Sequence, residues 1–390
     1  MKVQLLARPD HALYLYRGIK NQIDVKMLNF NCFHENSIQS KLYPHKKTVD
    51  SDVTVLHSLT MFKQLLINAS KFVNFDMNLW ENKFSEFIYE FNFKDKENTD
   101  LIHYWPFYCH KFIKKLRDNQ GVITLADIHQ VHPFEGAKEL ESVYKFYNLN
   151  LNQSHFIVNA ERSLEFLEHE NNVIVPSKYV ADTYLKYYPN LNISIAQYGL
   201  LGGSVEMNNQ DFEKNENSKL KFVFVGTVSL EKGVHTLIEA ALKTKSDITL
   251  IGPIEEKQRH IFEPHFNKEN IHFVGKIPNS SVKTELKKYD VFVLPSLSDA
   301  YSLAVIEAIS CGLPVIVSNK TGNAFDVELY GLGEVATSQS VESLSETLLA
   351  FNERDKINFY KENILNYLKE ENSFGYPDRV LKIYSKLLKF

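Results

Sequence analysis

Short apolar runs, each followed by a helical pattern, recur through the second half of this 390-residue chain. The runs are Leu220–Val225, Ile248–Ile251, Ile271–Val274 and Asp290–Leu294, and a glycine or a proline follows each of them. After the first run, residues 234–242 carry apolar side chains at the spacing of one helix face. Strands that alternate with helices form parallel βαβ units, so this half predicts a doubly wound α/β domain.

The first half shows the same alternation with longer interruptions. The expected strands are Lys2–Ala7, Val53–Leu56, Leu101–Trp105, Val122–Ala126, Asn172–Pro176 and Asn192–Ala196. An aromatic-rich stretch, residues 68–100, is interpreted either as a helical insertion with its rings packed inward or as a lid over an acceptor site or a membrane. We expect an N-terminal domain over residues 1–205, a polar linker over 206–219, a C-terminal domain over 220–373, and a last helix, 374–390, that packs back on the first domain.

Composition narrows the function classes. Lys and Arg number 44 against 48 Asp and Glu, a net charge of −4, so no nucleic-acid partner is expected. Cys32, Cys109 and Cys311 are odd in number and widely spaced, which argues against a disulfide framework and a CxxC metal site. The first residues lack the apolar core of a signal peptide, and no run approaches the roughly 20 apolar residues of a spanning helix. A cytoplasmic protein is expected.

Ligands of open parallel sheets bind beyond the carboxyl ends of the strands, which singles out two loops in the second half. The first loop runs from Gly226 to Gly233, before a helix whose free N–H groups and positive dipole suit a phosphate. Lys232 adds a full positive charge there. A lysine that simply points into solvent is an equally good interpretation of this pattern.

The second loop contains two carboxylates. Asp299 precedes an expected helix, and Glu307 lies about one turn inside it. The backbone N–H groups between them include those of Tyr301, Ser302 and Leu303. Carboxylates accept hydrogen bonds from sugar hydroxyls, and N–H groups at a helix start hold phosphate. The alternative is an N-cap aspartate followed by a solvated glutamate. Because Glu307 stands in the apolar run VIEAI and a buried unpaired carboxylate is costly, we expect it to be buried and to face a polar ligand.

These loops carry a family resemblance. The segments FVGTVSLEKGVHTLIEA, FVGKIP and VFVLPSLSDAYSLAVIEAISCGLPVIVSNKTGN follow one another as in family-4 glycosyltransferases of the GT-B fold, and residues 220–330 resemble the donor half of that family. The segment VIVPSKYVADTYLKYY resembles the end of the family's N-terminal domain, whereas residues 1–150 match loosely. The resemblance implies two Rossmann-like domains facing a central cleft, with a nucleotide-sugar donor on the C-terminal domain and an acceptor on the N-terminal one.

The resemblance also implies roles for individual residues. Lys232 is expected to contact the donor diphosphate, with Gly226 and Thr227 in the same loop. Glu307 matches the second acid of the family's E-x7-E motif and is expected to bind ribose, and Asp299 matches the first acid, near the donor sugar. Family members retain the anomeric configuration and need neither a metal nor a cofactor, the donor being a substrate.

Two further loops complete the expected donor site. Its phosphate-directed N–H groups are those of Tyr301, Ser302 and Leu303, and Gly322 and Asn323 match a Gly-Gly loop under the sugar. The chain departs from the family at Thr227, where an arginine is common, so another basic residue or the helix dipole must supply the missing charge. Asp299 replaces a glutamate and has a shorter reach. Asn323 replaces a glycine, and Asn tolerates the left-handed conformation better than most residues.

The segment LADIHQVHP offers candidates near the reacting sugar. It follows an expected strand and puts His129 and His132 on a loop that we expect to face the cleft. The resemblance implies one histidine after this strand, and His129, His132 and Asp127 all remain candidates for this catalytic position. Either histidine is equally well a structural loop residue, and metal binding by the three side chains is a less favoured alternative.

The DxD sequence Asp50-Ser51-Asp52 matches the metal–diphosphate motif of the other glycosyltransferase fold, GT-A. In that fold the acids follow a buried strand, whereas here they follow a polar run and precede the apolar run VTVL. Acids at the amino end of a strand lie far from where ligands bind, so we interpret them as a solvated turn. No metal is expected.

Together these features predict a retaining, metal-independent glycosyltransferase that moves a sugar from a nucleotide-sugar donor to a glycan or lipid-linked acceptor, with a bacterial surface polysaccharide such as lipopolysaccharide or capsule as product. A non-catalytic sugar-nucleotide-binding subunit is the alternative that Thr227 and Asp299 suggest, and a GT-B phosphorylase, synthase or epimerase is a nearer one. The basic segments HKFIKKLR and YSKLLKF either make peripheral contact with the inner face of the cell membrane or are ordinary solvated faces.

Overall fold

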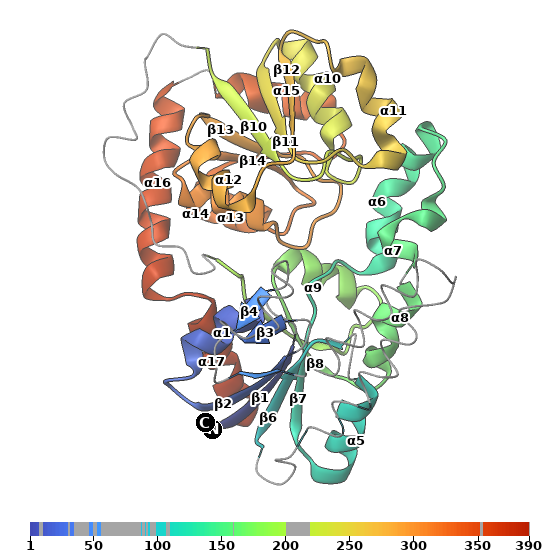
Figure 1. Ribbon diagram of the computed structural model, residues 1–390, viewed down its shortest axis with the longest axis vertical. Coiled ribbons are helices and arrows are strands. Elements are labelled where there is room, and N and C mark those ends of the chain that lie inside the picture. Colours follow the sequence, from blue (N-terminus) through green and yellow to red (C-terminus); the bar gives the residue numbers. More distant parts are fainter. Residues whose placement is uncertain are drawn as a thin grey trace.

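The computed structural model describes residues 1–7, 11–29, 32–34, 47–49, 53–55, 87, 90, 93, 99–106, 110–158, 160–199, 219–351 and 354–389. The chain forms two α/β domains, stacked along the long axis of the molecule (Figure 1). Asp50, Asp52 and most of the aromatic-rich stretch lie outside the described residues, as does the expected linker except for Lys219.

Each domain is built on a parallel sheet. The first sheet has the order β5-β2-β1-β6-β7-β8-β9, and the second has the order β12-β11-β10-β13-β14-β15. The strands of the first are β1 (Lys2–Ala7), β2 (Asp24–Asn29), β5 (Thr54–Val55), β6 (Leu101–Tyr104), β7 (Ile123–Asp127), β8 (Asn172–Val175) and β9 (Asn192–Ile195). Those of the second are β10 (Lys221–Val225), β11 (Asp247–Ile251), β12 (Ile271–Gly275), β13 (Val291–Leu294), β14 (Val315–Ser318) and β15 (Gly333–Ala336). A separate pair joins β3 (Cys32–His34) to β4 (Lys47–Val49).

Helices cover the sheets. Those of the first domain are α1 (His11–Ile19), α5 (His110–Gln120), α6 (Pro133–Phe146), α7 (His155–Val158), α8 (Ala160–Leu164) and α9 (Lys178–Leu185). Those that follow β10 are α10 (Val234–Thr244), α11 (Arg259–Phe262), α12 (Asn279–Leu286), α13 (Leu303–Ser310), α14 (Ala324–Tyr330), α15 (Val341–Ala350), α16 (Arg354–Ser373) and α17 (Tyr376–Leu388).

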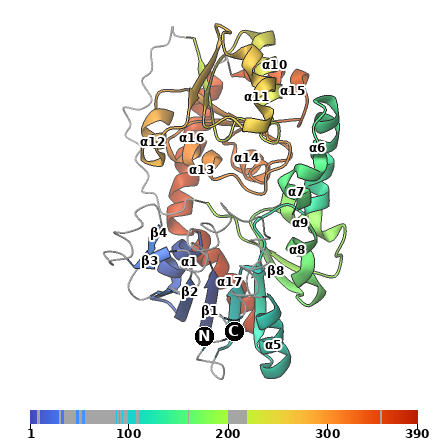
Figure 2. The ribbon, with the colours of Figure 1, turned by 45° about the vertical axis from the view of Figure 1, so that its right-hand side comes forward.

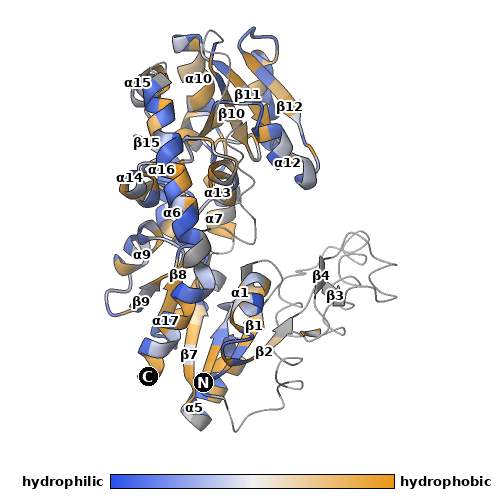
Figure 3. Ribbon diagram, turned by 90° about the vertical axis from the view of Figure 1, so that its left-hand side faces the viewer, coloured by the Kyte–Doolittle hydropathy of each residue, from blue (hydrophilic) through white to orange (hydrophobic). Residues whose placement is uncertain are grey.

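The strands are the apolar centre of each domain (Figure 3). Leu5 and Leu125 in the first sheet and Val223, Phe224 and Phe292 in the second are fully buried. Parallel strands covered on both faces need continuous apolar runs, which is why the expected strands are confirmed to within a few residues at each end.

The last helix returns to the first domain. α16 leads from the second domain toward the first, and α17 then packs against α1 (Figure 1). The two ends of the chain lie near each other on the first domain. The second domain is thus inserted, in topological terms, between β9 and α17.

Candidate functional site

Lys232 and Asp299 form an ion pair at the carboxyl edge of the second sheet. Lys232 stands in the loop between β10 and α10, and its Nζ lies 2.6 Å from Oδ2 of Asp299, in the loop that follows β13. The lysine side chain is 34% exposed and the aspartate 11% exposed. Two residues far apart in the sequence therefore meet where parallel sheets bind ligands.

Close backbone packing holds these loops together. Gly233 has a φ of 69°, and a Cβ there would lie 1.9 Å from the carbonyl oxygen of Pro295, at the end of β13. A side chain at Gly322 would meet the carbonyl oxygen of Ala300 at 1.7 Å and the hydroxyl of Ser177 at 2.6 Å. Only glycine fits at either position, so the backbone itself sets the distance between the loops.

The loop after β14 also contacts Asp299. The Asp299 N–H donates to the carbonyl of Lys320 over 3.0 Å, and the Gly322 N–H donates to the carbonyl of Asp299 over 2.8 Å. Gly226 at the end of β10 donates its N–H to Ile251, and the side chain of the adjacent Thr227 is exposed. The structure thus brings together the predicted residues of three loops.

Asn323 plays a different part from the one expected. Its φ is −73°, in the right-handed region, so the tolerance of Asn for the left-handed conformation is not what allows Asn to replace glycine here. The buried side chain instead accepts a 2.7 Å hydrogen bond from the Ser302 N–H and lies 3.3 Å from the Ser302 carbonyl, to which its Nδ2 donates. Since Asn323 already takes the Ser302 N–H, that group is not free to hold a phosphate as the sequence had predicted.

Tyr301 and Leu303 flank Ser302, which Asn323 holds by two hydrogen bonds, and their side chains differ in exposure. The buried Tyr301 hydroxyl donates to Asp326 over 2.9 Å, and burial raises the pKa of Asp326 to about 6. The Leu303 side chain is exposed at the start of α13. The Tyr301 ring therefore supports the loop from inside, and its backbone, with that of Leu303, stays a candidate for phosphate binding.

Glu307 is exposed, and the expectation that it is buried was wrong. Its neighbours Val305, Ile306, Ala308 and Ile309 face the core, which leaves Glu307 on the outer side of α13. Partial desolvation still raises the pKa of its carboxyl. The carboxylate has no hydrogen-bond partner among the residues that the structure describes.

Asp127 lies where the first sheet packs against α17. It is buried at the end of β7, 3.3 Å from Nε2 of His103, and it accepts a long hydrogen bond of 3.4 Å from the Tyr376 hydroxyl. Nδ1 of His103 lies 2.7 Å from the hydroxyl of Tyr384. Nothing in the sequence drew attention to His103, because a histidine inside a short apolar strand has no motif around it.

His132 is enclosed rather than presented to a ligand. It is 1% exposed, its ring stacks on Tyr187 at 4.0 Å, and Tyr184 packs edge-on against it. Burial lowers the pKa of His132 to about 4, so the ring is neutral at pH 7. The expectation that it faces the cleft was wrong. His129, two residues beyond β7, is partly exposed.

The predicted turn at Asp50 and Asp52 falls on residues outside those described, but its flanks are informative. β5 begins at Thr54, so the acids precede a strand as the sequence predicted, and β4 ends at Val49, so a short strand that the sequence did not predict precedes them. No group of three or more His, Cys, Asp or Glu side chains within the described part of the chain is arranged to hold a metal ion. Likewise, no helix in that part combines the length and apolarity needed to cross a membrane.

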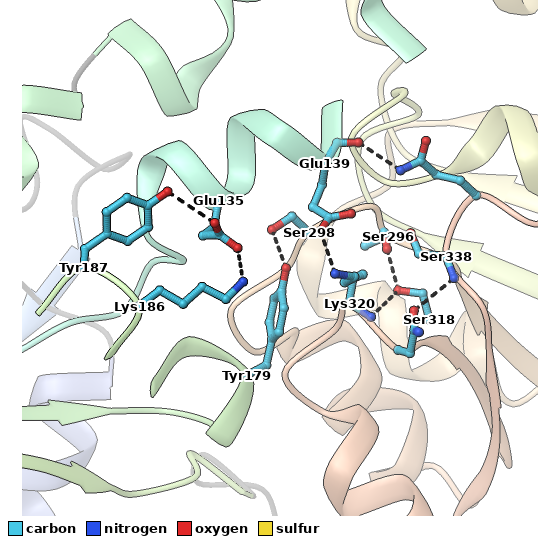
Figure 4. Close-up of polar contacts among 12 residues, drawn as sticks. Glu135, Glu139, Tyr179, Lys186, Tyr187, Ser296, Ser298, Ser318, Lys320 and Ser338 are labelled. Carbon is cyan, nitrogen blue, oxygen red and sulfur yellow. Dashed lines mark hydrogen bonds and ion pairs between the residues drawn. The ribbon is translucent and has the colours of Figure 1, made fainter. Parts of the chain in front are cut away.

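Helices α6 and α9 of the first domain contact the loops of the second (Figures 2 and 4). Tyr144 donates a hydrogen bond to Glu231, the neighbour of Lys232. The Tyr179 hydroxyl lies 3.1 Å from that of Ser298, and the Ser177 hydroxyl donates to the carbonyl of Ala300 over 2.8 Å. The two domains therefore meet directly beside Lys232 and Asp299.

Part of the chain that includes this site is similar to a known protein family. Residues 206–364 match the model of the family described as "Glycosyl transferases group 1". The matched segment spans about two fifths of the chain, and over that segment the chain is similar to this family. The residues matched include the loops that carry Lys232, Asp299 and Gly322.

Several bacterial glycosyltransferases are similar to part of the chain. The chain is 27% identical to the N,N'-diacetylbacillosaminyl-diphospho-undecaprenol alpha-1,3-N-acetylgalactosaminyltransferase of Campylobacter jejuni, over 63% of this chain and 64% of that protein. It is 29% identical to the putative colanic acid biosynthesis glycosyltransferase WcaL of Escherichia coli, over 35% of this chain and 37% of that one. The chain thus matches from about a third to two thirds of these relatives' lengths.

Solved structures share the whole architecture. Sucrose-phosphate synthase from Thermosynechococcus elongatus superimposes with a TM-score of 0.66 at 16% identity, over 100% of this chain and 99% of that one. The lipopolysaccharide glycosyltransferase WaaG gives 0.62 at 14% identity, over 98% and 99% of the two chains. At these identities the likeness shows the fold, which is GT-B as the sequence predicted.

Proposed function

We propose that this protein is a retaining, metal-independent glycosyltransferase that uses a nucleotide-sugar donor. The observation that carries the proposal is the partly exposed Lys232 at the carboxyl edge of the second sheet, paired with Asp299 and adjacent to Glu231, which contacts Tyr144 of the first domain. Breaking the glycosidic bond leaves a diphosphate, and a fixed cation beside that leaving group stabilises the transition state. Retention and metal independence rest on the family resemblance, in which the leaving phosphate itself takes the acceptor's proton.

The donor site follows from the loops already described. We assign the diphosphate to Lys232 and the backbone N–H groups of Tyr301 and Leu303, and the sugar to Asp299 and Gly322. Glu307, exposed on α13, is assigned to the ribose, whose hydroxyls would supply the partners that its carboxylate lacks among the described residues.

A lipid-linked glycan is the proposed acceptor, in the synthesis of a bacterial surface polysaccharide. The names of two relatives specify undecaprenyl-diphosphate acceptors: the Campylobacter jejuni enzyme and a UDP-Gal:alpha-D-GlcNAc-diphosphoundecaprenol alpha-1,3-galactosyltransferase of Escherichia coli. Such acceptors reside in a membrane. The exposed Lys111 and Lys115 of α5 are candidates for peripheral contact with an anionic membrane surface.

A panel of nucleotide sugars tests the proposal. A ligand at 100 times its dissociation constant stabilises the fold by about 2.7 kcal/mol, which a melting curve detects. The stabilising donor is then incubated with undecaprenyl-diphosphate-linked sugars in excess EDTA, and the anomeric configuration of the product is read by NMR. Stabilisation with neither transfer nor slow donor hydrolysis would instead identify a non-catalytic sugar-nucleotide-binding subunit. Activity that disappears in EDTA would overturn metal independence.

A further inference from the structure

Lys320 is a second lysine fixed beside the Lys232–Asp299 pair. It lies in the loop that follows β14, where its N–H donates to the Ser318 hydroxyl over 3.2 Å and its carbonyl accepts the N–H of Asp299. Ser318 is fully buried, and its hydroxyl also donates to the carbonyl of Ser296 over 2.5 Å. The backbone of Lys320 is therefore held in place, and only its flexible side chain is free to change partner.

The ammonium group of Lys320 is paired with a carboxylate of the other domain. Its Nζ lies 2.6 Å from Oε1 of Glu139 on α6, with the lysine side chain 34% exposed and the glutamate 19% exposed (Figure 4). The Gln339 side chain donates to the backbone carbonyl of Glu139 over 2.9 Å, which keeps this turn of α6 against the second domain. Partly exposed ion pairs contribute about 0–1 kcal/mol, so a doubly charged anion competes well for such a lysine.

The two lysines share one arrangement. Lys232 and Lys320 are equally exposed, each has one carboxylate partner in the structure, and Asp299 contacts the first through its side chain and the second through its backbone. Thr227 offers no charge on its side of the loop. We propose that Lys320 is the second cationic contact of the donor diphosphate, and that Glu139 competes with the diphosphate for it; this rests on the proposed donor site.

Calorimetric titration with UDP and with inorganic pyrophosphate tests the assignment in four variants, and Lys232→Ala is titrated beside them as the test of the proposed donor site itself. Lys320→Gln should weaken the binding of both probes about tenfold, because a hydrogen bond to a charged group is lost. Glu139→Gln should act in the opposite direction and tighten both about two- to fivefold, since a competing carboxylate is removed. Glu139→Gln combined with Lys320→Gln should show no such tightening. Lys356→Gln is the matched control, because Lys356 on α16 is 30% exposed and paired with a carboxylate of its own, that of Glu334 on β15.

Each other result counts against the proposal. If Lys320→Gln binds UDP like the wild type while Lys232→Ala does not, Lys320 is only an interdomain ion pair and the proposed function stands. If neither variant changes UDP binding, or the wild type binds neither probe, the proposed donor site fails and this assignment fails with it. If Lys320→Gln raises the KM for the lipid-linked acceptor and leaves the KM for the donor unchanged, the anion belongs to the acceptor, and the donor assignment is wrong.

Discussion

The carboxyl edges of the two sheets use their polar side chains differently. In the second domain Lys232, Asp299 and Lys320 stand in loops and keep part of their surface exposed. In the first domain Asp127 and His132 are buried, the former against the last helix and the latter under Tyr187. Similar residue types at strand ends are thus partly exposed, and proposed to bind a ligand, in one sheet and are packed inside the other. Exposure, more than residue type, separates the two uses.

Among the changes considered, Lys232→Ala should have the largest effect, because it removes a partly exposed charge from the second domain. We expect turnover to fall about 10²–10³-fold, the usual effect of removing one transition-state contact, with little change in the melting temperature because the side chain is partly exposed in a loop. Initial rates with the donor found in the screen measure this. Lys356→Ala is the control, and a Lys232→Ala enzyme with near-wild-type turnover would remove Lys232 from the site.

Burial of the neutral His132 ring should make the free energy of unfolding depend on pH. Its pKa is about 4 in the folded state against about 6.5 unfolded, so as pH falls the unfolded chain binds a proton first. The contribution is therefore constant above about pH 6.5, declines as pH falls toward 4, and amounts to at most about 3 kcal/mol. Urea unfolding from pH 7 to pH 4 should give a shallower decline for His132→Phe than for the wild type. His260→Phe, at an exposed histidine, is the control, and equal slopes in all three proteins would contradict the assignment.

Glu307→Gln tests whether an exposed carboxylate of the second domain binds the nucleotide. If the carboxylate accepts hydrogen bonds from ribose, its loss should raise the dissociation constant of UDP about tenfold. Stability should change little, because the side chain lies on the outer side of α13. Calorimetry checks the first point, with Glu328→Gln on exposed α14 as a control. Unchanged UDP affinity would mean that Glu307 is only a solvated helix residue.

The smallest expected effect is on stability, when a buried hydrogen bond of the first domain is removed. Tyr376→Phe removes the hydroxyl that donates to Asp127 over 3.4 Å, a long bond, so we expect a loss of about 1 kcal/mol in unfolding free energy. UDP affinity should remain at the wild-type value. A drop in UDP affinity without a drop in stability would show that this hydrogen bond acts on the donor site.

Sequence patterns predicted much of the fold and part of the site, for physical reasons. Continuous apolar runs such as Leu220–Val225 identify strands buried on both faces, whereas β2, with alternating polar residues, and the four-residue β15 leave too weak a pattern. The loops of Lys232 and Asp299 were predictable because parallel strands end at one edge.

The remaining errors concern side-chain environment. The run around Glu307 is apolar in sequence, yet helical rotation puts that one residue outside. No local pattern reveals that Asn323 binds Ser302, that His132 lies under Tyr187, or that Lys320 reaches Glu139, since each contact joins segments far apart in the chain.

The return of α17 to the first domain constrains the order of events during synthesis on the ribosome. Tyr376 and Tyr384 complete the surroundings of Asp127 and His103, but they are made after the entire second domain. At about 5–20 residues per second, the interval between residue 199 and residue 376 is on the order of 10–35 s. Throughout it the first sheet carries a carboxylate and a histidine whose covering helix does not yet exist. The nascent first domain therefore cannot reach its final stability before the second has been translated, and that half-finished surface is where a chaperone would be expected to bind.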